Sequence, residues 1–360
     1  MSSKKVIFVG SFLDKSKTGG VGGQMFACKS LVESDISNEV EWLKIDSTAE
    51  SNLKIPLRKR VLRALSRIFK LLKLLLFNSP STAILFSSNG FSFLEKGTMV
   101  LIIKFLRPKV KVILAPRSGR IKAELKGKRL KFAQKVFNKS DIIICQGDSW
   151  KQFFTAEVCP DPKKYVTIKN WINTELYGGE KEANNLIEIL FLAWLEIDKG
   201  LLDLIHSVDQ LIQEGHSFKL RIAGKGKHEE EARALVAELN LESTVIFEGW
   251  VLGEMKHNLL NNSDIFVLPS YFEGSPNALL EAMASSCACV STTVGAIPDI
   301  IENGKNGFIG EAGDVESLIK HLRMLLLDDE LRTRIASQAM LDVQRNHSIE
   351  SATTKFKEII

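Results

Sequence analysis

The stretch IFVLPSYFEGSPNALLEAMASSCACV, residues 265–290, contains the pattern that decides the fold. Its first four residues predict a buried strand, and ACV at its end predicts another. Between them, Ser275 as a cap and Pro276 at the first helical position are typical of a helix start. An apolar period then predicts a helix over 277–284. A strand, a helix and a strand in this order favour a parallel sheet with a crossover helix.

The same alternation extends over most of the chain. The predicted strands are short, apolar and rich in β-branched residues, as is typical of sheets covered on both faces. They alternate with segments of helical period such as 201–214 and 315–327. We expect strands at 6–10, 40–45, 83–86, 110–114, 142–145, 166–168, 187–193, 219–223, 245–247, 265–268 and 288–290. This number is too large for one ordinary sheet. The sequence therefore predicts an α/β protein with two Rossmann-like, doubly wound, parallel-sheet domains.

Length and composition agree with that organisation. The 360 residues suit two domains, and 45% hydrophobic with 25% charged residues excludes disordered and fibrous classes. Five cysteines without metal spacing favour a reducing cytoplasm. No apolar run approaches the ~18 residues of a membrane span. We interpret the start, MSSKKVIFVGS, as a first strand rather than a signal peptide.

The net charge of +5 conceals two oppositely charged halves. The first 180 residues carry 32 Lys/Arg against 15 Asp/Glu, and the last 180 carry 16 against 28, giving +17 and −12. The sign changes in the Gly- and charge-rich segment YGGEKEANN, residues 177–185. We therefore expect an N-terminal domain at 1–178 and a C-terminal domain at 179–344. A final helix, about 345–360, is expected to pack back on the first domain.

The turn before the predicted helix 277–284 has the features of a ligand site. It follows a parallel strand at its carboxyl end, where open α/β sheets bind ligands. Gly274 permits close approach of the backbone, and free amides at a helix start favour phosphate. Glu273 and Glu281 flank the turn, and carboxylates accept hydrogen bonds from sugar hydroxyls. This arrangement favours a nucleotide-sugar; a surface helix with two solvated glutamates is the alternative.

Seven residues separate Glu273 from Glu281, which resembles the Glu-x7-Glu signature of retaining family 4 glycosyltransferases. Four further segments are similar to that family: FLAWLEIDKG (191–200), AGKG (223–226), VGAIPDI (294–300) and ENGKNGFI (302–309). The resemblance covers nearly all of residues 187–330. In the first half only the Gly-rich loop and APRSGR (115–120) are compatible with it.

The resemblance implies the GT-B architecture, in which two Rossmann-like domains face each other across a cleft. The first would be the acceptor domain and the second the nucleotide-sugar donor domain. Glu273 and Lys199 would be the catalytic residues, with Glu273 at the donor sugar and Lys199 at the phosphate, and Glu281 would bind the ribose. The alternative interpretation is that Lys199 is a solvated lysine in a loop. The remaining donor-binding positions would be Gly274, Ser275, Pro276, Asn277, Gly20, Gly22, Gly224 and Lys225.

One position departs from the family pattern. Many members have Gly-Arg-Leu where this chain has Ala193–Trp194–Leu195, so one expected phosphate cation is absent. Either Lys225 or a cation of the first domain compensates, or activity is weak. A catalytically weak, sugar-nucleotide-binding or scaffold protein on the GT-B fold therefore stays as the alternative.

A glycine-rich loop, residues 19–23, follows the first predicted strand. The amides of Gly20 and Gly22 could cradle the donor phosphate from the other domain, or the loop is merely flexible. Met25 occupies the third glycine position of a dinucleotide-binding fingerprint, which argues against a dehydrogenase.

Residues 54–73, KIPLRKRVLRALSRIFKLLK, carry eight basic residues and no acidic one. They predict an amphipathic helix that can lie on an anionic bilayer. We expect its apolar stripe, which includes Leu62, Leu65 and Phe69, to pack on the sheet. The basic face towards lipid would comprise Arg60, Arg63, Arg67 and Lys70. An ordinary domain helix without lipid contact is the alternative.

A second basic block, residues 104–139, holds 13 Lys/Arg and one acidic residue. Nucleic acid would explain such clustering, but few aromatic residues accompany it and no nucleic-acid motif is present. Arg117, Ser118 and Arg120 follow a predicted strand, where they could contact an acceptor phosphate or the donor diphosphate. A plain surface loop is the alternative.

No histidine follows a first-half strand, and no Asp-x-Asp motif is present. We therefore expect no metal and no cofactor. The family resemblance further implies that the leaving phosphate assists deprotonation of the acceptor. The resemblance implies a retaining, metal-independent hexosyltransferase that moves a sugar from a nucleotide-sugar to a glycan or polyprenyl-diphosphate-linked acceptor, and the lipid-linked acceptor rests on the basic first domain. We expect it in bacterial surface polysaccharide synthesis (lipopolysaccharide O-antigen or capsule), peripheral at the cytoplasmic face of the cell membrane.

Overall fold

The computed structural model describes residues 3–13, 23–48, 56–179, 181 and 186–360. The chain forms two compact units, one of residues 1–170 with 349–360 and the other of residues 171–348. The division lies eight residues before the boundary expected at 178, because Ile172 already belongs to the core of the second unit. The change of charge at 177–185 marks a segment within the second unit. The last helix joins the first unit from Ile349 rather than from about 345.

The first unit contains a six-stranded parallel sheet with the order β2-β1-β3-β4-β5-β6 among its described residues. The strands β1, β3, β4 and β5 are buried on both faces, which explains their nearly continuous apolar runs, whereas the edge strand β2 exposes Glu41 and Lys44. Their bounds are β1 Lys4–Gly10, β2 Val40–Asp46, β3 Thr82–Ser87, β4 Lys111–Pro116, β5 Ile142–Cys145 and β6 Tyr165–Thr167.

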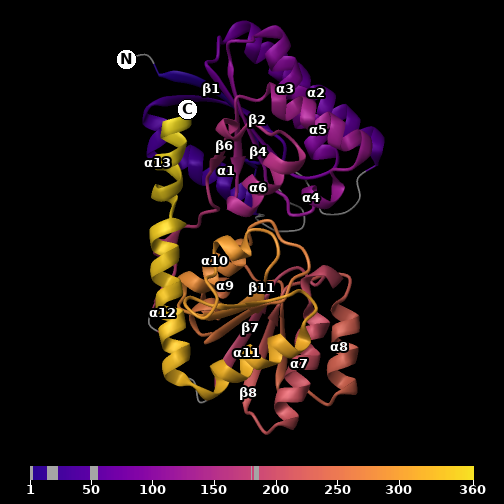
Figure 1. Ribbon diagram of the computed structural model, residues 1–360, viewed down its shortest axis with the longest axis vertical. Coiled ribbons are helices and arrows are strands. Elements are labelled where there is room, and N and C mark those ends of the chain that lie inside the picture. The colour runs from indigo at the N-terminus through magenta and orange to yellow at the C-terminus, as the bar shows by residue number, and fades with distance from the viewer. Residues whose placement is uncertain (1–2, 14–22, 49–55, 180, 182–185) are drawn as a thin grey trace. The chain divides into compact units, whose positions relative to one another are not determined.

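Helices cover both faces of this sheet. Figure 1 shows α2, α3 and α5 side by side, and α1 and α13 adjacent to one another. The helices of the first unit are α1 Gly23–Glu33, α2 Leu57–Phe77, α3 Phe91–Leu106, α4 Ile121–Glu124, α5 Gly127–Lys139, α6 Asp148–Glu157 and α13 Ile349–Ile359. The predicted helix 54–73 corresponds to α2, and residues 54 and 55 lie outside the described part.

The α2 helix faces the unit differently from the orientation predicted from its sequence. Leu62, Leu65 and Phe69, expected to pack on the sheet, are exposed. Arg67, expected at the lipid surface, instead forms an ion pair with Glu95 of α3, at 2.5 Å between Nε and Oε1. The helix packs through Ala64, Leu71 and Leu75. The prediction was wrong here because the apolar arc of α2 is wider than the strip that β2 and α3 cover.

The second unit contains another six-stranded parallel sheet, with the order β12-β11-β10-β7-β8-β9 in the part of the chain described. The strands are β7 Ile187–Leu192, β8 Phe218–Ala223, β9 Val245–Gly249, β10 Ile265–Leu268, β11 Ala288–Thr292 and β12 Phe308–Gly310. The sequence pattern missed β12, which has only three residues. The helices are α7 Leu201–Gln213, α8 Glu229–Glu238, α9 Gly253–Asn261, α10 Asn277–Ala284, α11 Val315–Leu327 and α12 Asp329–Asn346.

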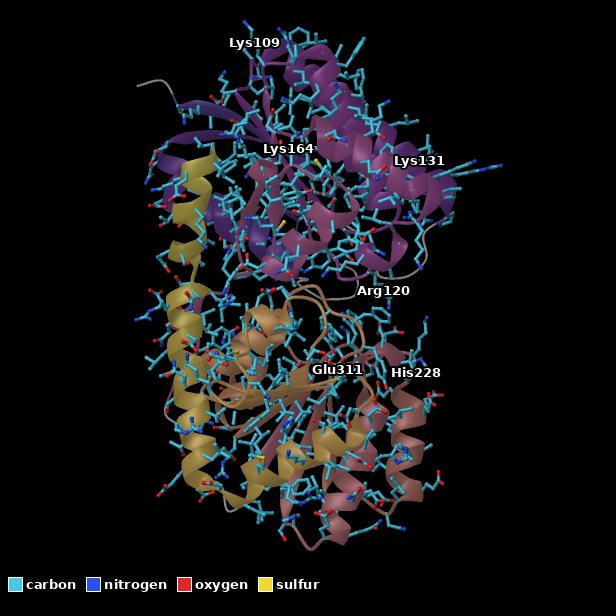
Figure 2. All side chains as sticks on the ribbon, viewed as in Figure 1. Lys109, Arg120, Lys131, Lys164, His228 and Glu311 are labelled. Carbon is cyan, nitrogen blue, oxygen red and sulfur yellow. The ribbon has the colours of Figure 1, made fainter. Side chains whose placement is uncertain are left out.

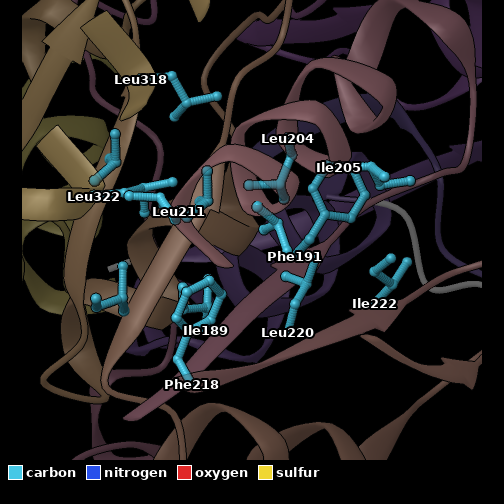
Figure 3. Packing of buried hydrophobic residues seen from close by; sticks show 14 of the residues in the cluster. Ile189, Phe191, Leu204, Ile205, Leu211, Phe218, Leu220, Ile222, Leu318 and Leu322 are labelled. Atoms are coloured by element: carbon cyan, nitrogen blue, oxygen red, sulfur yellow. The ribbon is translucent and has the colours of Figure 1, made fainter. Parts of the chain in front are cut away.

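Two clusters of buried apolar residues, one on each face of the second sheet, pack its strands against the flanking helices. Figure 3 shows the cluster in which Phe191 and Leu220 of the sheet meet Leu204 and Leu211 of α7 and Leu322 of α11. The other cluster packs α10 and α12 on the opposite face. The doubly wound, two-sheet α/β organisation predicted from the alternation is confirmed.

Within the described residues, none of the helices combines the length and apolarity that a bilayer crossing requires. The five cysteines are buried and unbridged. Burial raises the pKa of the Cys28, Cys145 and Cys287 thiols to about 12. They are therefore inert core residues rather than reactive thiols.

Candidate functional site

The loop between β10 and α10 forms the centre of the candidate site. The strand ends at Leu268, and α10 begins at Asn277. Pro276 is the residue before the helix, with φ −75° and ψ 119°, and its own side chain makes no cap hydrogen bond. The expected capping by Ser275 with Pro276 at the first helical position is therefore wrong, because the extended ψ of Pro276 keeps it outside the helix. Backbone amides at a helix start point along the helix axis, an orientation that favours an anion.

Lys199 and Glu273, 74 residues apart in sequence, form an ion pair in the second unit. The distance between Nζ and Oε1 is 2.5 Å, and the two side chains are 18% and 12% exposed. Ser270 Oγ donates to the same carboxylate oxygen at 3.0 Å. The predicted catalytic pair is thus brought together, with the carboxylate held from two sides.

Gly200 allows the Lys199 turn to approach the β10 loop. Its φ is +69°, and a Cβ placed on it would lie 2.1 Å from the carbonyl oxygen of Pro269. Only glycine fits that backbone conformation at that spacing. The backbone amide of Tyr271 also donates to the Asp198 carbonyl at 2.9 Å.

The VGAIPDI segment, residues 294–300, supports the loop from the other side. Gly295 has φ +64°, and a Cβ there would lie 2.3 Å from the Glu273 carbonyl oxygen. The Ala296 amide donates to the Gly274 carbonyl at 2.8 Å. This segment therefore fixes the backbone at Glu273 and Gly274.

Glu281 lies on the second turn of α10 and has its own lysine partner. Lys256 Nζ of α9 lies 2.8 Å from Glu281 Oε1, and the side chains are 22% and 13% exposed. Burial, and then the neighbouring charge of Glu281, raise the pKa of the Tyr177 phenol well above its ordinary value. Burial and the charge of Lys256 lower the pKa of His257. Leu279, Leu280 and Met283, the residues around Glu281 that the helical period assigns to the core, are buried.

The AGKG segment, residues 223–226, packs tightly against the chain after β7. A Cβ on Gly224, whose φ is +151°, would lie 1.9 Å from the Ala193 carbonyl oxygen. The Lys225 side chain is exposed. Trp194, at the position where many family members have arginine, packs on Trp250 with ring centroids 4.5 Å apart. An aromatic pair thus occupies the place of the expected cation.

The candidate residues of the first unit lie at the carboxyl end of β4. Arg117 bonds to the side chain of Asn170 and lies over the Phe86 ring, 5.0 Å from its centroid. Burial lowers the pKa of its guanidinium to about 10. Ser118 Oγ donates to Asn89 Oδ1 at 3.1 Å. Arg120, labelled in Figure 2, is exposed.

Two of the predicted positions, Gly20 and Gly22, lie outside the described residues. Among the residues that are described, no group of three or more His, Cys, Asp and Glu side chains could hold a metal ion.

Lys256, Tyr177 and Ser270 contact the two candidate carboxylates, and sequence reasoning did not single them out. Lys256 lies 25 residues from Glu281 on another helix, and nothing in its local sequence indicates that contact. Ser270 offered a weak signal, because it lies three residues before Glu273 in the same loop.

Solved structures share this fold over the whole chain. Sucrose-phosphate synthase from Thermosynechococcus elongatus superimposes with a TM-score of 0.80 at 14% identity, covering 99% of this chain and 98% of that one. HepE of Anabaena in complex with UDP and glucose gives 0.73 at 15% identity, with the same coverage. The two Rossmann-like units are those of the GT-B fold.

Sequence comparison shows that much of the second unit is similar to glycosyltransferases. Residues 176–341 match the family model of Glycosyl transferases group 1. WcaL of Salmonella typhimurium, named as a colanic acid biosynthesis glycosyltransferase, is 30% identical over 196 residues, or 52% of this chain and 48% of the relative. A Campylobacter jejuni relative, named as an N-acetylgalactosaminyltransferase acting on a diphospho-undecaprenol-linked sugar, is 26% identical over 62% of this chain and 61% of its own length. The matches thus span about half to three fifths of these relatives.

Proposed function

We propose that the protein is a retaining glycosyltransferase that takes its sugar from a nucleotide-sugar bound at the β10–α10 loop. One observation carries the proposal. The Glu273–Glu281 segment, with Lys199 beside it, lies at the carboxyl end of a parallel strand within the region that matches the glycosyltransferase family model. Open α/β sheets bind ligands at that edge.

Different residues of this site bind different parts of the nucleotide-sugar. The amides from Gly274 to Asn277 receive the diphosphate, and Lys199 neutralises the charge that develops on it as the sugar leaves. Glu281 accepts hydrogen bonds from the ribose, and Glu273 accepts them from the donor sugar. In the Lys199–Glu273 ion pair, the cation proposed for the phosphate lies next to the carboxylate proposed to accept hydrogen bonds from the donor sugar.

Further donor and acceptor contacts complete the proposal. Gly224 and Lys225 line the donor site, and Arg117, Ser118 and Arg120 contact an acceptor or donor phosphate. Helix amides and lysine handle the phosphate charge, so the reaction needs no metal or cofactor. The acceptor is a glycan or a polyprenyl-diphosphate-linked sugar in bacterial surface polysaccharide synthesis, such as lipopolysaccharide or capsule. The Campylobacter relative's name supports the lipid-linked class. The basic first half favours a peripheral location at the cytoplasmic face of an anionic membrane.

A second candidate is a nucleotide-sugar-binding or scaffold protein with weak activity. The Trp194–Trp250 pair favours it, because an aromatic ring replaces a cation at the phosphate position.

A donor screen by mass spectrometry separates the two functions. The protein is incubated with UDP-, GDP- and dTDP-sugars and candidate acceptors, and transfer or hydrolysis is measured. We expect turnover of at least one donor. At donor concentrations below the KM, turnover should fall about tenfold or more in Glu281→Ala through weaker donor binding, and it should be lost in Lys199→Ala. Binding without turnover across all donors supports the scaffold.

Control variants in the same screen are Glu229→Ala and Arg233→Ala, which remove an ion pair on the surface of α8. They should turn the donor over as the wild type does. Near-normal turnover in both Glu281→Ala and Lys199→Ala would contradict the assigned site.

A further inference from the structure

The α2 helix exposes an apolar face made of Leu62, Leu65, Phe69 and Leu76. These side chains are 66%, 56%, 60% and 59% exposed. Their spacing of three, four and seven residues places them along one side of the helix. We call these four residues the α2 apolar face. A continuous apolar strip on the surface indicates an interaction site rather than scattered exposure.

The core side of α2 is occupied by other residues. Ala64, Leu71 and Leu75 are buried, and Arg67 pairs with Glu95 of α3. Within the described residues, the α2 apolar face therefore lies mostly outside the contacts that hold the helix on its unit. Such an apolar strip is available to a partner.

Basic residues border the α2 apolar face. The helix contains seven Lys/Arg and no acidic residue. At 100° per residue, Lys59, Lys70 and Lys73 project beside the apolar strip, and all three are exposed. Lys73 Nζ lies 4.7 Å from the centre of the Phe69 ring. Lysine stems can lie along apolar surface while the ammonium groups reach anionic headgroups.

We propose that the α2 apolar face inserts into the interface of an anionic bilayer, with Lys59, Lys70 and Lys73 at the lipid headgroups. A helix with an apolar strip, a basic border and no acidic residue has the features of an interfacial helix. Charge argues for lipid over a second copy, since a twofold contact through α2 would bring two strongly basic helices together. This arrangement differs from the one expected from sequence, because the apolar face rather than the basic face enters the lipid.

The inference rests on the membrane location in the proposed function, and it does not depend on sugar transfer. The two are tested separately. Vesicle binding is measured without any donor, and transfer is measured with a soluble acceptor and no vesicles. Failure of one leaves the other intact.

The first experiment labels Leu65→Cys with an environment-sensitive fluorophore such as NBD. The five native cysteines are buried, so the new thiol is the accessible one. The matched control is Leu341→Cys on α12, where the leucine is 55% exposed. Phosphatidylcholine vesicles containing phosphatidylglycerol should shift the emission of the label at 65 to the blue and leave the label at 341 unchanged. An unshifted spectrum at 65 would overturn the proposal.

The second experiment measures co-sedimentation of the Leu62→Ser/Leu65→Ser/Phe69→Ser variant with the same vesicles. We expect about tenfold or greater loss of binding, because three apolar side chains no longer enter the lipid. The control, Leu327→Ser/Leu341→Ser, replaces leucines that are 68% and 55% exposed on α11 and α12. It should bind as the wild type does. All variants should keep their thermal unfolding transition, since the replaced residues are exposed.

Two results would contradict the proposal. Undiminished sedimentation of the triple serine variant would show that α2 is not the lipid contact. A wild-type dimer that the triple variant converts to a monomer, with no vesicle binding by either, would show that a second copy covers the α2 apolar face. Analytical ultracentrifugation distinguishes that case.

Discussion

Each carboxylate of the candidate site has a lysine beside it. Lys199 pairs with Glu273, and Lys256 pairs with Glu281. The ion pairs hold both carboxylates in place before a ligand arrives, and such preorganisation lowers the cost of binding. The structure shows Lys256 in contact with Glu281, and we predict that it positions this carboxylate.

Replacing Lys256 with alanine tests that role. Lys256→Ala should raise the KM for the donor several-fold and leave kcat nearly unchanged, because ribose contacts are made equally in the ground and transition states. Lys256→Arg should restore most of the affinity. Steady-state kinetics checks both values, and a fall in kcat at unchanged KM would contradict the role. Arg233→Ala on α8 is the control.

Sequence alone could predict only part of this site. Glu273 and Glu281 were found because they lie close together around one predicted helix. The lysine that pairs with Glu281 comes from α9, and its contact depends on how α9 and α10 pack. Lys199 was identified through the family resemblance, since the tertiary fold brings it to Glu273 across 74 residues.

Among the elements, α2 and α3 share a buried charge cluster. Glu95 lies between Arg67 of α2 and Lys96 of its own helix, at 2.5 Å and 3.3 Å. The side chains of Glu95 and Lys96 are 2% and 3% exposed. Burial lowers the pKa of Lys96, and the charge of Glu95 opposes that shift. The cluster orients α2 and thereby leaves its apolar face outside.

Removing the shared acid should therefore destabilise the first unit. Glu95→Ala leaves two cations without their carboxylate, and we expect a loss of about 3 kcal/mol in the free energy of unfolding. Chemical denaturation measures it. Glu41→Ala, at an exposed pair with Lys5, should change the value by less than about 0.5 kcal/mol. Equal changes in the free energy of unfolding for Glu95→Ala and Glu41→Ala would contradict a stabilising role of the buried cluster.

The strands could be predicted well, and the orientation of α2 could not. Strands covered on both faces have apolar runs that are visible in the sequence, as in ILFS of β3. For α2, the apolar arc is wide enough to allow more than one buried side. The choice depends on Glu95, which lies 28 residues beyond Arg67. A period of 3.6 residues contains no information about that partner.

The chain returns to its first unit at residues 349–360. Phe356 of α13 is fully buried and lies 6.3 Å from the ring of Phe86, centroid to centroid. Lys357 pairs with Asp35 at 2.6 Å. Through these contacts α13 packs on the first unit, as expected of the last helix.

Phe356→Ala should therefore destabilise the first unit by about 3 kcal/mol through the cavity it leaves. The matched change in the second unit is Phe266→Ala, which also removes a fully buried ring. Hydrogen exchange should show lost protection of β1 and β3 in the first variant, and of β7 and β10 in the second. Loss of protection in β7 and β10 on Phe356→Ala would place α13 in the wrong unit.

We propose above all that the second unit binds a nucleotide-sugar through the Glu273–Glu281 segment. Isothermal titration with UDP, GDP and dTDP measures this binding, using the full chain, Glu281→Ala and the control Glu229→Ala. We expect at least one nucleoside diphosphate to bind. Glu281→Ala should weaken this binding about tenfold or more, as expected for loss of hydrogen bonds to a charged group, and Glu229→Ala should leave it unchanged. Binding of equal strength in the wild type and Glu281→Ala, or no binding of any of the three, would contradict it.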